Sequence, residues 1–350
     1  MPVLKSSVNA ASAEFKASMA HHHALAKELE DRVAQAREGG GKEARDRHEK
    51  RGKLHARERV KRLLIVDGHA YAYRAFHAIR ELRAPDGRPT NAIYGFVKML
   101  EKMRAAVAPT HLVVVWDGGL NAERLAALPD YKAQRPDMPA DLRPQLDGIV
   151  EFLAAAGIAS HWADGVEADD CIATLARRAA DGWHVVIASS DKDFMQLVSG
   201  RVGLLNPNDK TGTIWGREQV LAKTGVEPEQ VADWLALMGD AVDNIPGVPG
   251  VGPKTAAELL KQFGTVENLL ARLDEVKSEK LRQSLRAAAA AVIRNQKLVR
   301  LPEVPCGLVL EQLTVGGGDG AALHRLYAGW GFRGMLAALA APGEKQAELI

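Results

Sequence analysis

Three short apolar runs in this chain each lead into an aspartate, and amphipathic segments separate them. The runs and their acids are 63–66 with Asp67, 111–116 with Asp117, and 183–188 with Asp191. Runs of this length predict buried strands, and the residues 91–107 and 168–180 predict helices between them. Such alternation indicates a mostly parallel sheet with helices on both faces. Because the carboxyl ends of parallel strands line the ligand crevice, we expect the three aspartates to meet there.

A run of acids at the start of the helix predicted over 168–180 adds to this set. Glu167, Asp169 and Asp170 lie within one turn, and two further acidic motifs, 190–193 and 239–244, follow along the chain. Clustered carboxylates repel one another and desolvate poorly, so bound divalent cations are the physical solution. Oxygen-only ligands favour Mg²⁺ or Mn²⁺ over zinc. The nine candidate ligands are Asp67, Asp117, Glu167, Asp169, Asp170, Asp191, Asp193, Asp240 and Asp243.

Composition excludes several classes of protein. A chain of 350 residues has room for two or three units, and its longest apolar runs are far shorter than the ~20 residues of a membrane span. We expect no membrane span and no export signal. Cys171 and Cys306 lack CxxC spacing, so we expect two buried thiols in a reducing cytoplasm. The net charge of +2 leaves room for a nucleic-acid partner, because a basic groove and an acidic cleft cancel in the sum.

Residues 1–62 differ in character from the rest of the chain. They are charged, rich in alanine and helical in pattern, with a break at Gly39–Gly41 and a basic run at 45–54 that is typical of a solvated helix face. The residues 52–64 resemble the N-terminal lead-in of acyl-CoA carboxylase carboxyltransferase subunits, which carries no catalytic group. We interpret this extension as a fused fragment or a misplaced gene start.

Two segments without strand signals are candidates for binding a polyanion. The residues 118–146 follow the second strand, so their basic and aromatic side chains should lie over the acidic crevice. The glycine-rich turn 245–256 feeds a helix, and glycines with free amides at a helix start favour a phosphate. It resembles a helix-hairpin-helix grip on the duplex backbone. A solvated lid and a plain turn between two helices remain the alternatives.

Six motifs, in this order and spacing, resemble the 5′-3′ exonuclease (flap endonuclease) domain of the bacterial DNA polymerase I family, over about Leu64 to Leu339. The motifs are Val66-Asp67-Gly68, Tyr73-Arg74-Ala75-Phe76-His77, Tyr131-Lys132-Ala133-Gln134-Arg135-Pro136, Glu167-Ala168-Asp169-Asp170, Ser190-Asp191-Lys192-Asp193 and Gly239-Asp240-Ala241-Val242-Asp243-Asn244. No polymerase segment follows, so the chain looks like a stand-alone member. The resemblance implies a PIN-like or resolvase-like α/β core and an all-helical, helix-hairpin-helix type DNA-binding subdomain.

The resemblance also implies roles for single residues. One metal would be held by Asp67, Asp117, Glu167 and Asp169, with Asp170 and Asp191 close by. A second would be held by Asp193, Asp240 and Asp243. Lys132 and Arg135, on a helical arch, would meet the scissile phosphate, and Arg74 would support phosphate binding.

Contacts to DNA are implied as well. Arg124 would bind the 5′ strand and Tyr131 would stack on a base. The duplex grip, with a K⁺ ion bound by carbonyls, would use Gly247, Val248, Gly250, Val251, Gly252, Lys254 and Thr255. One departure is that Glu123-Arg124 stands where the family commonly has Phe-Arg, and Gly118-Gly119-Leu120 lacks the usual small-Lys element.

These inferences predict a domain order and a function. We expect an extension at 1–62, a nuclease core at 63–228 with an arch at 119–146, a helical duplex-binding part at 229–342, and a tail at 343–350. The predicted function is hydrolysis of phosphodiester bonds near 5′ ends at flaps, nicks or gaps by two Mg²⁺ ions in DNA replication and repair. We expect a monomer of the bacterial cytoplasm and nucleoid, linked functionally to a polymerase and a ligase. The alternatives are a branched-DNA-binding protein with weak or no cleavage, a metal-dependent ribonuclease, and a carboxylase-related module.

Overall fold

The computed structural model describes residues 12–37, 61–207, 209 and 211–340, and the chain divides into two compact units, 1–60 and 61–350. The first unit contains α1 (Ala13–Arg37), in agreement with the helical pattern predicted for the extension. The predicted glycine break and basic run lie outside the described residues, as does most of the segment that resembles a carboxyltransferase. The last two residues of that segment, Leu63 and Leu64, belong to the first strand of the second unit.

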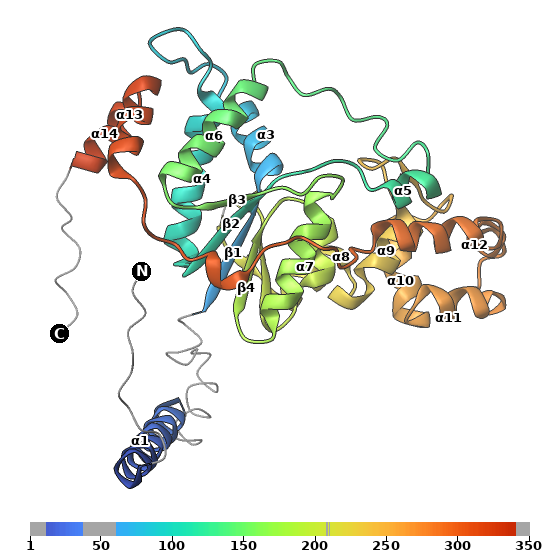
Figure 1. The fold of residues 1–350 in the computed structure, drawn as a ribbon. Helices are drawn as coiled ribbons and strands as arrows, with labels where there is room; N and C mark the ends of the chain where they lie inside the picture. Colours follow the sequence, from blue (N-terminus) through green and yellow to red (C-terminus); the bar gives the residue numbers. More distant parts are fainter. Residues whose placement is uncertain (1–11, 38–60, 208, 210, 341–350) are drawn as a thin grey trace. The chain divides into compact units, whose positions relative to one another are not determined.

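A single six-stranded sheet organises the second unit (Figure 1). The strand order is β3-β2-β1-β4-β5-β6; the first five strands are parallel and β6 is antiparallel to β5. The strands are β1 (Arg62–Asp67), β2 (His111–Val115), β3 (Ala159–His161), β4 (His184–Ala188), β5 (Val202–Leu205) and β6 (Ile214–Trp215). The expected strands at 63–67, 111–116 and 183–188 are confirmed, and the mostly parallel sheet is confirmed with them.

Helices cover both faces of this sheet. Alternate residues of β1 point to opposite sides, so Leu64 and Val66 pack into one core and Leu63 and Ile65 into the other. The first core is covered by α3 (Gly68–Ala78), α4 (Asn91–Val107), α6 (Arg143–Ala155), α13 (Gly320–Trp330) and α14 (Arg333–Ala340). The second core contains α7 (Ala168–Ala180), which lies across the sheet from α4 in Figure 1. The predicted helices at 91–107 and 168–180 match α4 and α7 residue for residue.

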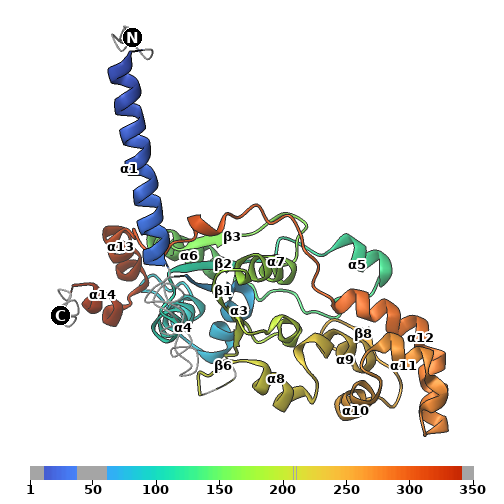
Figure 2. The ribbon, with the colours of Figure 1, turned by 90° about the horizontal axis from the view of Figure 1, so that it is seen from below.

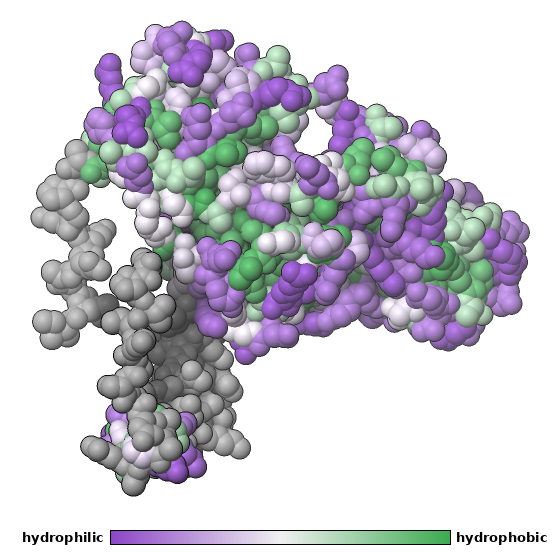
Figure 3. Space-filling view, in the orientation of Figure 1, coloured by the Kyte–Doolittle hydropathy of each residue, from purple (hydrophilic) through white to green (hydrophobic). Residues whose placement is uncertain are grey.

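Helices dominate after β6, as the sequence predicts. Figures 1 and 2 place this helical part at the opposite end of the second unit from α13 and α14. Its elements are α8 (Arg217–Thr224), α9 (Val231–Met238), α10 (Pro253–Phe263), α11 (Val266–Ala271) and α12 (Glu279–Val299), with the two-residue strands β7 (Gly239–Asp240) and β8 (Ile245–Pro246). Short 3₁₀ turns occur at Lys192–Leu197, Pro228–Gln230, Leu273–Glu275 and Leu310–Gln312. Hydrophilic residues dominate the lower edge of the face drawn in Figure 3.

The segment expected to form a helical arch is helical only near its ends. Within 119–146 the structure has α5 (Ala122–Ala127) and the start of α6 at Arg143, and the residues between them form turns and an irregular stretch at 135–139. This differs from the expectation because Pro136 and Pro139 remove backbone donors that a continuous helix needs.

Two further expectations concern the cysteines and membrane spans. Cys171 and Cys306 are buried and free, as expected. Among the described ranges, none of the helices is long and apolar enough to cross a membrane.

Candidate functional site

Local backbone contacts hold three aspartates at the carboxyl ends of the central strands. Asp67 ends β1 and caps α3 by accepting the amide of Ala70 at 3.0 Å. Asp117, two residues after β2, accepts the amide of Ala168 at 2.9 Å. Asp191, beyond β4, accepts the amide of Asp193 at 2.9 Å. Each of the three acids therefore lies at or just beyond the carboxyl end of its strand, which agrees with the expectation that they meet at one edge of the sheet.

Gly118 allows the loop after β2 to approach the loop before α7. A Cβ at this position would lie 1.8 Å from the carbonyl oxygen of Ala163. Two backbone bonds join the loops, from Gly118 N–H to Val166 O at 3.0 Å and from Gly165 N–H to Gly118 O at 2.9 Å. The loop that carries Asp117 is thereby fixed against the loop that leads to Glu167.

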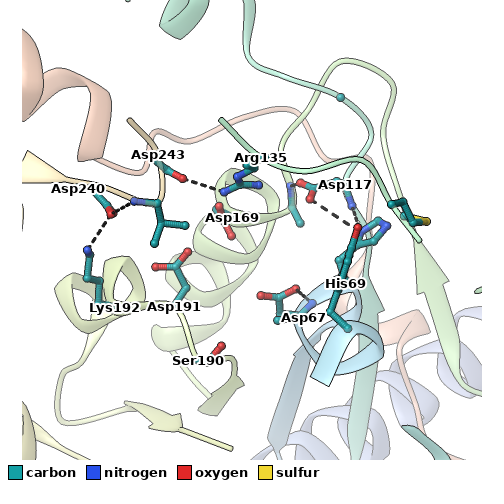
Figure 4. Close-up of a pocket in the computed structure, with 16 residues that line it drawn as sticks. Asp67, His69, Asp117, Arg135, Asp169, Ser190, Asp191, Lys192, Asp240 and Asp243 are labelled. Carbon is teal, nitrogen blue, oxygen red and sulfur yellow. Dashed lines mark hydrogen bonds and ion pairs between the residues drawn. The ribbon is translucent and has the colours of Figure 1, made fainter. Parts of the chain in front are cut away.

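These acids open onto one cavity of about 670 Å³ (Figure 4). Six of the nine predicted ligands line it: Asp67, Asp117, Asp169, Asp191, Asp240 and Asp243. Figure 4 shows Asp169 and Asp191 between the pair formed by Asp67 and Asp117 and the pair formed by Asp240 and Asp243. His69, Tyr73, Arg135, Met138 and Lys192 complete much of the wall. Acids from β1, the 117–118 loop, α7, the 190–193 turn and the β7–β8 loop therefore converge on one space.

Three of the predicted ligands bring carboxylate oxygens close together. One carboxylate oxygen each of Asp193, Asp240 and Asp243 lie within 4.8 Å of one another. Oδ1 of Asp193 is buried and has no hydrogen-bond partner among the described residues. A buried carboxylate that has an unpartnered oxygen and lies close to two other carboxylates fits a hard divalent cation. The donor set therefore suits the metal that the sequence predicts.

Burial and mutual repulsion disfavour the charged form of several of these acids. Burial raises the pKa of Asp67 to about 6, and the nearby charges of Asp117 and Asp191 add to the effect. Burial, followed by repulsion from neighbouring aspartates, raises the pKa of Asp169 and Asp193 well above the usual value. A positive charge bound in the cavity would favour the charged carboxylates and so offset both effects.

Besides Arg124, described below, three basic side chains form ion pairs with acids of the cluster. Lys132 Nζ lies 2.7 Å from Oε2 of Glu167, Arg135 Nη2 lies 2.8 Å from Oδ1 of Asp243, and Lys192 Nζ lies 2.9 Å from Oδ1 of Asp240. Figure 4 shows the last two pairs on the cavity wall. The structure thus brings Lys132 and Arg135 to the cluster, as the sequence predicts.

The turn that carries Lys132 is docked on the β7–β8 loop. The Lys132 amide donates to Asp243 O at 3.0 Å, and Asn244 Nδ2 donates to Asp130 O at 2.8 Å. Both Lys132 and Asn244 adopt positive φ, at 56° and 57°. Non-glycine residues in this region are uncommon, and here each sits at a tight turn on one side of the same junction.

Tyr131 lies beneath this turn rather than on its surface. Only 3% of the residue is exposed, and its hydroxyl is 3.2 Å from Oε2 of Glu167 and 3.3 Å from Oδ2 of Asp243. This placement differs from the expectation of base stacking, because the ring offers no exposed face. Tyr131 instead joins an acid before α7 to an acid of the β7–β8 loop.

Glu167 and Asp170 also lie behind the cavity wall. Both are essentially buried, and neither lines the cavity. Burial opposes ionisation of Glu167, but Lys132 and Arg124 outweigh it, so the pKa of Glu167 is lowered. Arg124, expected to contact DNA, is buried beside the same two acids. These three residues form the layer that supports the pocket-lining aspartates.

Arg74 is not brought to the acidic cavity. It is exposed and lines a separate cavity of about 210 Å³ with Tyr71 and Lys102, between α3 and α4. The motif that contains Arg74 does contribute Tyr73 to the acidic cavity, because successive residues of a helix point in different directions.

The glycine-rich turn divides into a buried and an exposed part. A Cβ on Gly247 would lie 2.2 Å from Met238 O, and Val248 and Val251 are buried, so these three residues pack the turn against α9. Gly250 and Gly252 have open space around them, and Lys254 is exposed at the start of α10, with Thr255 partly exposed beside it. Of the residues predicted to bind the duplex, Gly250, Gly252, Lys254 and Thr255 are therefore the ones that a backbone phosphate can reach.

Sequence reasoning did not assign His69, Ser189 or Lys192. Nδ1 of His69 accepts the amide of Asp117 at 3.2 Å, and burial lowers the pKa of the ring. Ser189 Oγ donates to Oδ2 of Asp67 at 2.8 Å. The available signal was position: each residue lies within two residues of a predicted ligand.

Comparisons with protein families match the second unit. Residues 62–225 match the 5′-3′ exonuclease, N-terminal resolvase-like domain, and residues 226–320 match the 5′-3′ exonuclease, C-terminal SAM fold. The resolvase-like core and the helical C-terminal part agree with the predicted fold class.

Two curated relatives illustrate the similarity. A 5′-3′ exonuclease of Aquifex aeolicus is 44% identical over 244 residues, which is 69% of this chain and 82% of the relative. DNA polymerase I of Bacillus caldotenax is 40% identical over 290 residues, 82% of this chain but 33% of the relative. The chain thus spans about a third of the length of the DNA polymerase I relatives that it matches.

Solved structures give the same fold. A bacteriophage T5 flap endonuclease in a complex with DNA and metal ions has a TM-score of 0.59 and 26% identity, over 69% of this chain and 90% of that chain. T5 5′-exonuclease with bound zinc has a TM-score of 0.58 and 27% identity over the same shares. The catalytic core of Rad2 with DNA substrate, at 19% identity, has a TM-score of 0.55 over 80% of this chain and 92% of that chain, and shares the fold.

Proposed function

The chain belongs to the 5′-3′ exonuclease family, and from this premise we propose that it hydrolyses phosphodiester bonds near DNA 5′ ends at junctions between single strand and duplex. The observation that carries the proposal is the convergence of seven aspartates on one site, with Lys132 and Arg135 bonded to its acids. The proposed substrates are 5′ flaps and nicked or gapped duplexes. The products would carry a 5′ phosphate and a 3′ hydroxyl.

The acids divide into two proposed metal sites. Asp67, Asp117 and Asp169, with Asp191 close by, would hold one Mg²⁺, and Asp193, Asp240 and Asp243 would hold the other, with Mn²⁺ as a substitute. Glu167 and Asp170 would support the first site from behind. When bound, the two ions would lower the pKa of an attacking water and neutralise charge on the leaving 3′ oxygen.

The basic residues of this chain would position the strand. Arg135 is bonded to Asp243 on the cavity wall, and Lys132 Nζ lies 3.9 Å from Oδ2 of Asp169, so a phosphate bound among these acids would lie close to both basic groups. Their charges would bind its oxygens and favour the pentavalent transition state over the ground state. Arg74 is exposed outside the cavity, and we propose that it contacts the DNA backbone there.

A second contact to DNA would come from the start of α10. The backbone N–H groups of Gly250 and Gly252, together with Lys254 and Thr255, would bind phosphates of the duplex, with K⁺ held by carbonyl oxygens of the turn. Such contacts read the backbone and not the base edges, so selectivity would follow the structure of the DNA.

The proposal extends to the domain order and the cellular setting. The core would occupy 63–228 and the duplex-binding part 229–342, and the protein would act as a monomer on the bacterial nucleoid alongside a polymerase and a ligase. Residues 1–62 would be a passenger in nuclease activity, and their likeness to a carboxyltransferase lead-in would reflect gene fusion or a misplaced start.

Cleavage of a 5′-end-labelled flap duplex tests the proposal. Wild type with Mg²⁺ is expected to cut near the junction, while added chelator or Asp191→Asn abolishes the product. Asp181→Asn, on an exposed residue at the end of α7, is the matched control and is expected to cut like wild type. Tight binding of the flap without cleavage, in Mg²⁺ and in Mn²⁺, would overturn the proposal in favour of a branched-DNA-binding protein.

A further inference from the structure

The guanidinium of Arg124 lies at the centre of a complete set of hydrogen bonds. Arg124 belongs to α5 and is 6% exposed. Nη1 donates to Oε2 of Glu167 at 2.7 Å and to Oδ2 of Asp170 at 3.0 Å, and Nη2 donates to Oδ1 of Asp170 at 2.7 Å. Nε and Nη2 also donate to the carbonyls of Leu298 at 3.0 Å and Arg300 at 3.2 Å. All five N–H groups of the side chain are used within the protein.

The two carbonyls belong to the C-terminal end of α12, where Leu298 is in the last turn and Arg300 is the cap. The last carbonyls of a helix have no partner within it and carry the negative end of its dipole, so a buried cation there is favourable. Arg124 therefore joins the end of α12 to the acids at the start of α7.

Glu167 is held from two sides by α5. The amide of Asn121, the cap of α5, donates to Oε1 at 3.0 Å, while Arg124 binds Oε2. The same oxygen accepts from Lys132, whose ammonium faces the cluster. The position of Lys132 thus depends on how Arg124 and Asn121 fix the carboxylate.

Asp170 has both oxygens bound to this layer. Oδ1 and Oδ2 each accept from Arg124, and Oδ2 lies 3.4 Å from Asn121 Nδ2. The side chain is fully buried and is absent from the cavity wall. Its geometry is that of a bidentate partner for a guanidinium rather than of a ligand facing the cavity.

We infer that Arg124 is a positioning residue that ties α12 to Glu167, and that Asp170 serves to hold Arg124 rather than to hold metal. The inference rests on the proposed nuclease function and assigns these residues a place within it. Charge alone does not suffice for this role, because a lysine ammonium cannot bind two carboxylates and two carbonyls in one plane.

The test separates positioning from a DNA contact. Arg124→Lys and Arg124→Gln are compared with wild type and with Arg104→Lys, an exposed control on α4. Affinity for a labelled 5′ flap is measured by anisotropy in chelator at several salt concentrations, and kcat is measured in Mg²⁺. We expect kcat to fall by about 10- to 100-fold, as for other residues that orient the groups of a site, with the Kd and its salt dependence unchanged.

A change in Kd with an unchanged kcat overturns the inference. If Arg124 binds a phosphate, the Kd rises and the slope of log K against log salt falls by about one, with kcat retained. A wild-type kcat in Arg124→Lys also overturns it. If wild type itself does not cut the flap, the proposed function fails; if wild type cuts and the variants match it, only the inference fails.

A double-mutant cycle decides the role of Asp170. Asp170→Asn is expected to lower kcat about as much as Arg124→Gln, and the double variant is expected to be no worse than either, because the two residues act as one unit. If the kcat losses of the two single variants multiply in the double variant, Asp170 acts independently of Arg124, and its assignment is overturned. Thermal unfolding of each variant verifies folding, and Arg124→Lys with Asp170→Asn keep the test decisive if Arg124→Gln does not fold.

Discussion

Nζ of Lys132 lies 2.7 Å from Oε2 of Glu167, although 35 residues separate them along the chain. The pair connects the turn that follows α5 with the acids at the start of α7. Nζ is buried and also lies 3.9 Å from Oδ2 of Asp169, which lines the acidic cavity, so a phosphate drawn into that cavity would lie close to this cation.

Replacement of Lys132 tests this placement. Lys132→Ala is expected to lower kcat on a 5′ flap by about 10²- to 10³-fold, the usual cost of removing one donor that stabilises a transition state. Lys98→Ala, an exposed lysine on α4, serves as the control. An unchanged kcat in Lys132→Ala would remove Lys132 from the proposed mechanism.

Asp193, whose Oδ1 has no hydrogen-bond partner among the described residues, predicts that Asp193→Asn changes Tm differently in chelator and in Mg²⁺. In chelator, Asp193→Asn is expected to raise Tm, because the charged carboxylate is disfavoured by burial and by its neighbours. In wild type, Mg²⁺ at 100 times its Kd should stabilise by about 2.7 kcal/mol, and the variant should lose most of this gain. Differential scanning fluorimetry with and without Mg²⁺ measures both. Equal Mg²⁺ shifts in the two proteins would contradict a metal at Asp193.

The raised pKa of Asp67 predicts how stability and nuclease activity change at acidic pH. Its pKa in the folded protein, about 6, lies above the usual 3.8, so the folded state holds this proton more tightly than the unfolded state. In chelator, this stabilising contribution is complete below pH about 4 and is lost as pH rises through about 6. With Mg²⁺ the proton competes with the metal, so activity should fall below pH about 6, and higher Mg²⁺ should move this limb to lower pH. A limb that does not respond to Mg²⁺ would exclude Asp67 as its origin.

Gly118 predicts a cost in stability at the site. Gly118→Ala places a Cβ against the carbonyl of Ala163, so the paired loops must separate, which should cost about 1–3 kcal/mol and reduce activity. Gly182→Ala is the control, because nothing lies within 4 Å of a Cβ there. Urea unfolding of both variants measures the difference, and equal midpoints would refute the close approach of the two loops.

The division into units 1–60 and 61–350 predicts that the first is dispensable for cleavage. A chain lacking residues 1–60 is expected to keep the Tm and the kcat of the full chain, since each compact unit has its own internal contacts. Loss of activity on deletion, with the Tm retained, would give the extension a part in DNA binding or catalysis.

Local patterns determined a large part of this protein. Short continuous apolar runs predicted the buried strands β1, β2 and β4, and amphipathic patterns predicted α4 and α7, because an apolar face on a helix repeats with the geometry of the backbone. The same patterns did not reveal β3, β5 or β6, because strands of two to four residues are too short to show a pattern of their own. The aspartates could be predicted because each follows a strand or starts a helix, so that its position is set by a few adjacent residues.

Only the tertiary structure decided which polar groups face the cavity and which lie behind it. From the sequence, Arg124 and Tyr131 were basic and aromatic residues of an exposed arch; in the structure both are buried, bonded to Glu167 and to segments more than a hundred residues away. Glu167 and Asp170 share one acidic run with Asp169, yet only Asp169 reaches the cavity. Contacts between segments distant in sequence decide which charged side chains are buried, because burial of a charge is tolerated only beside an opposite charge.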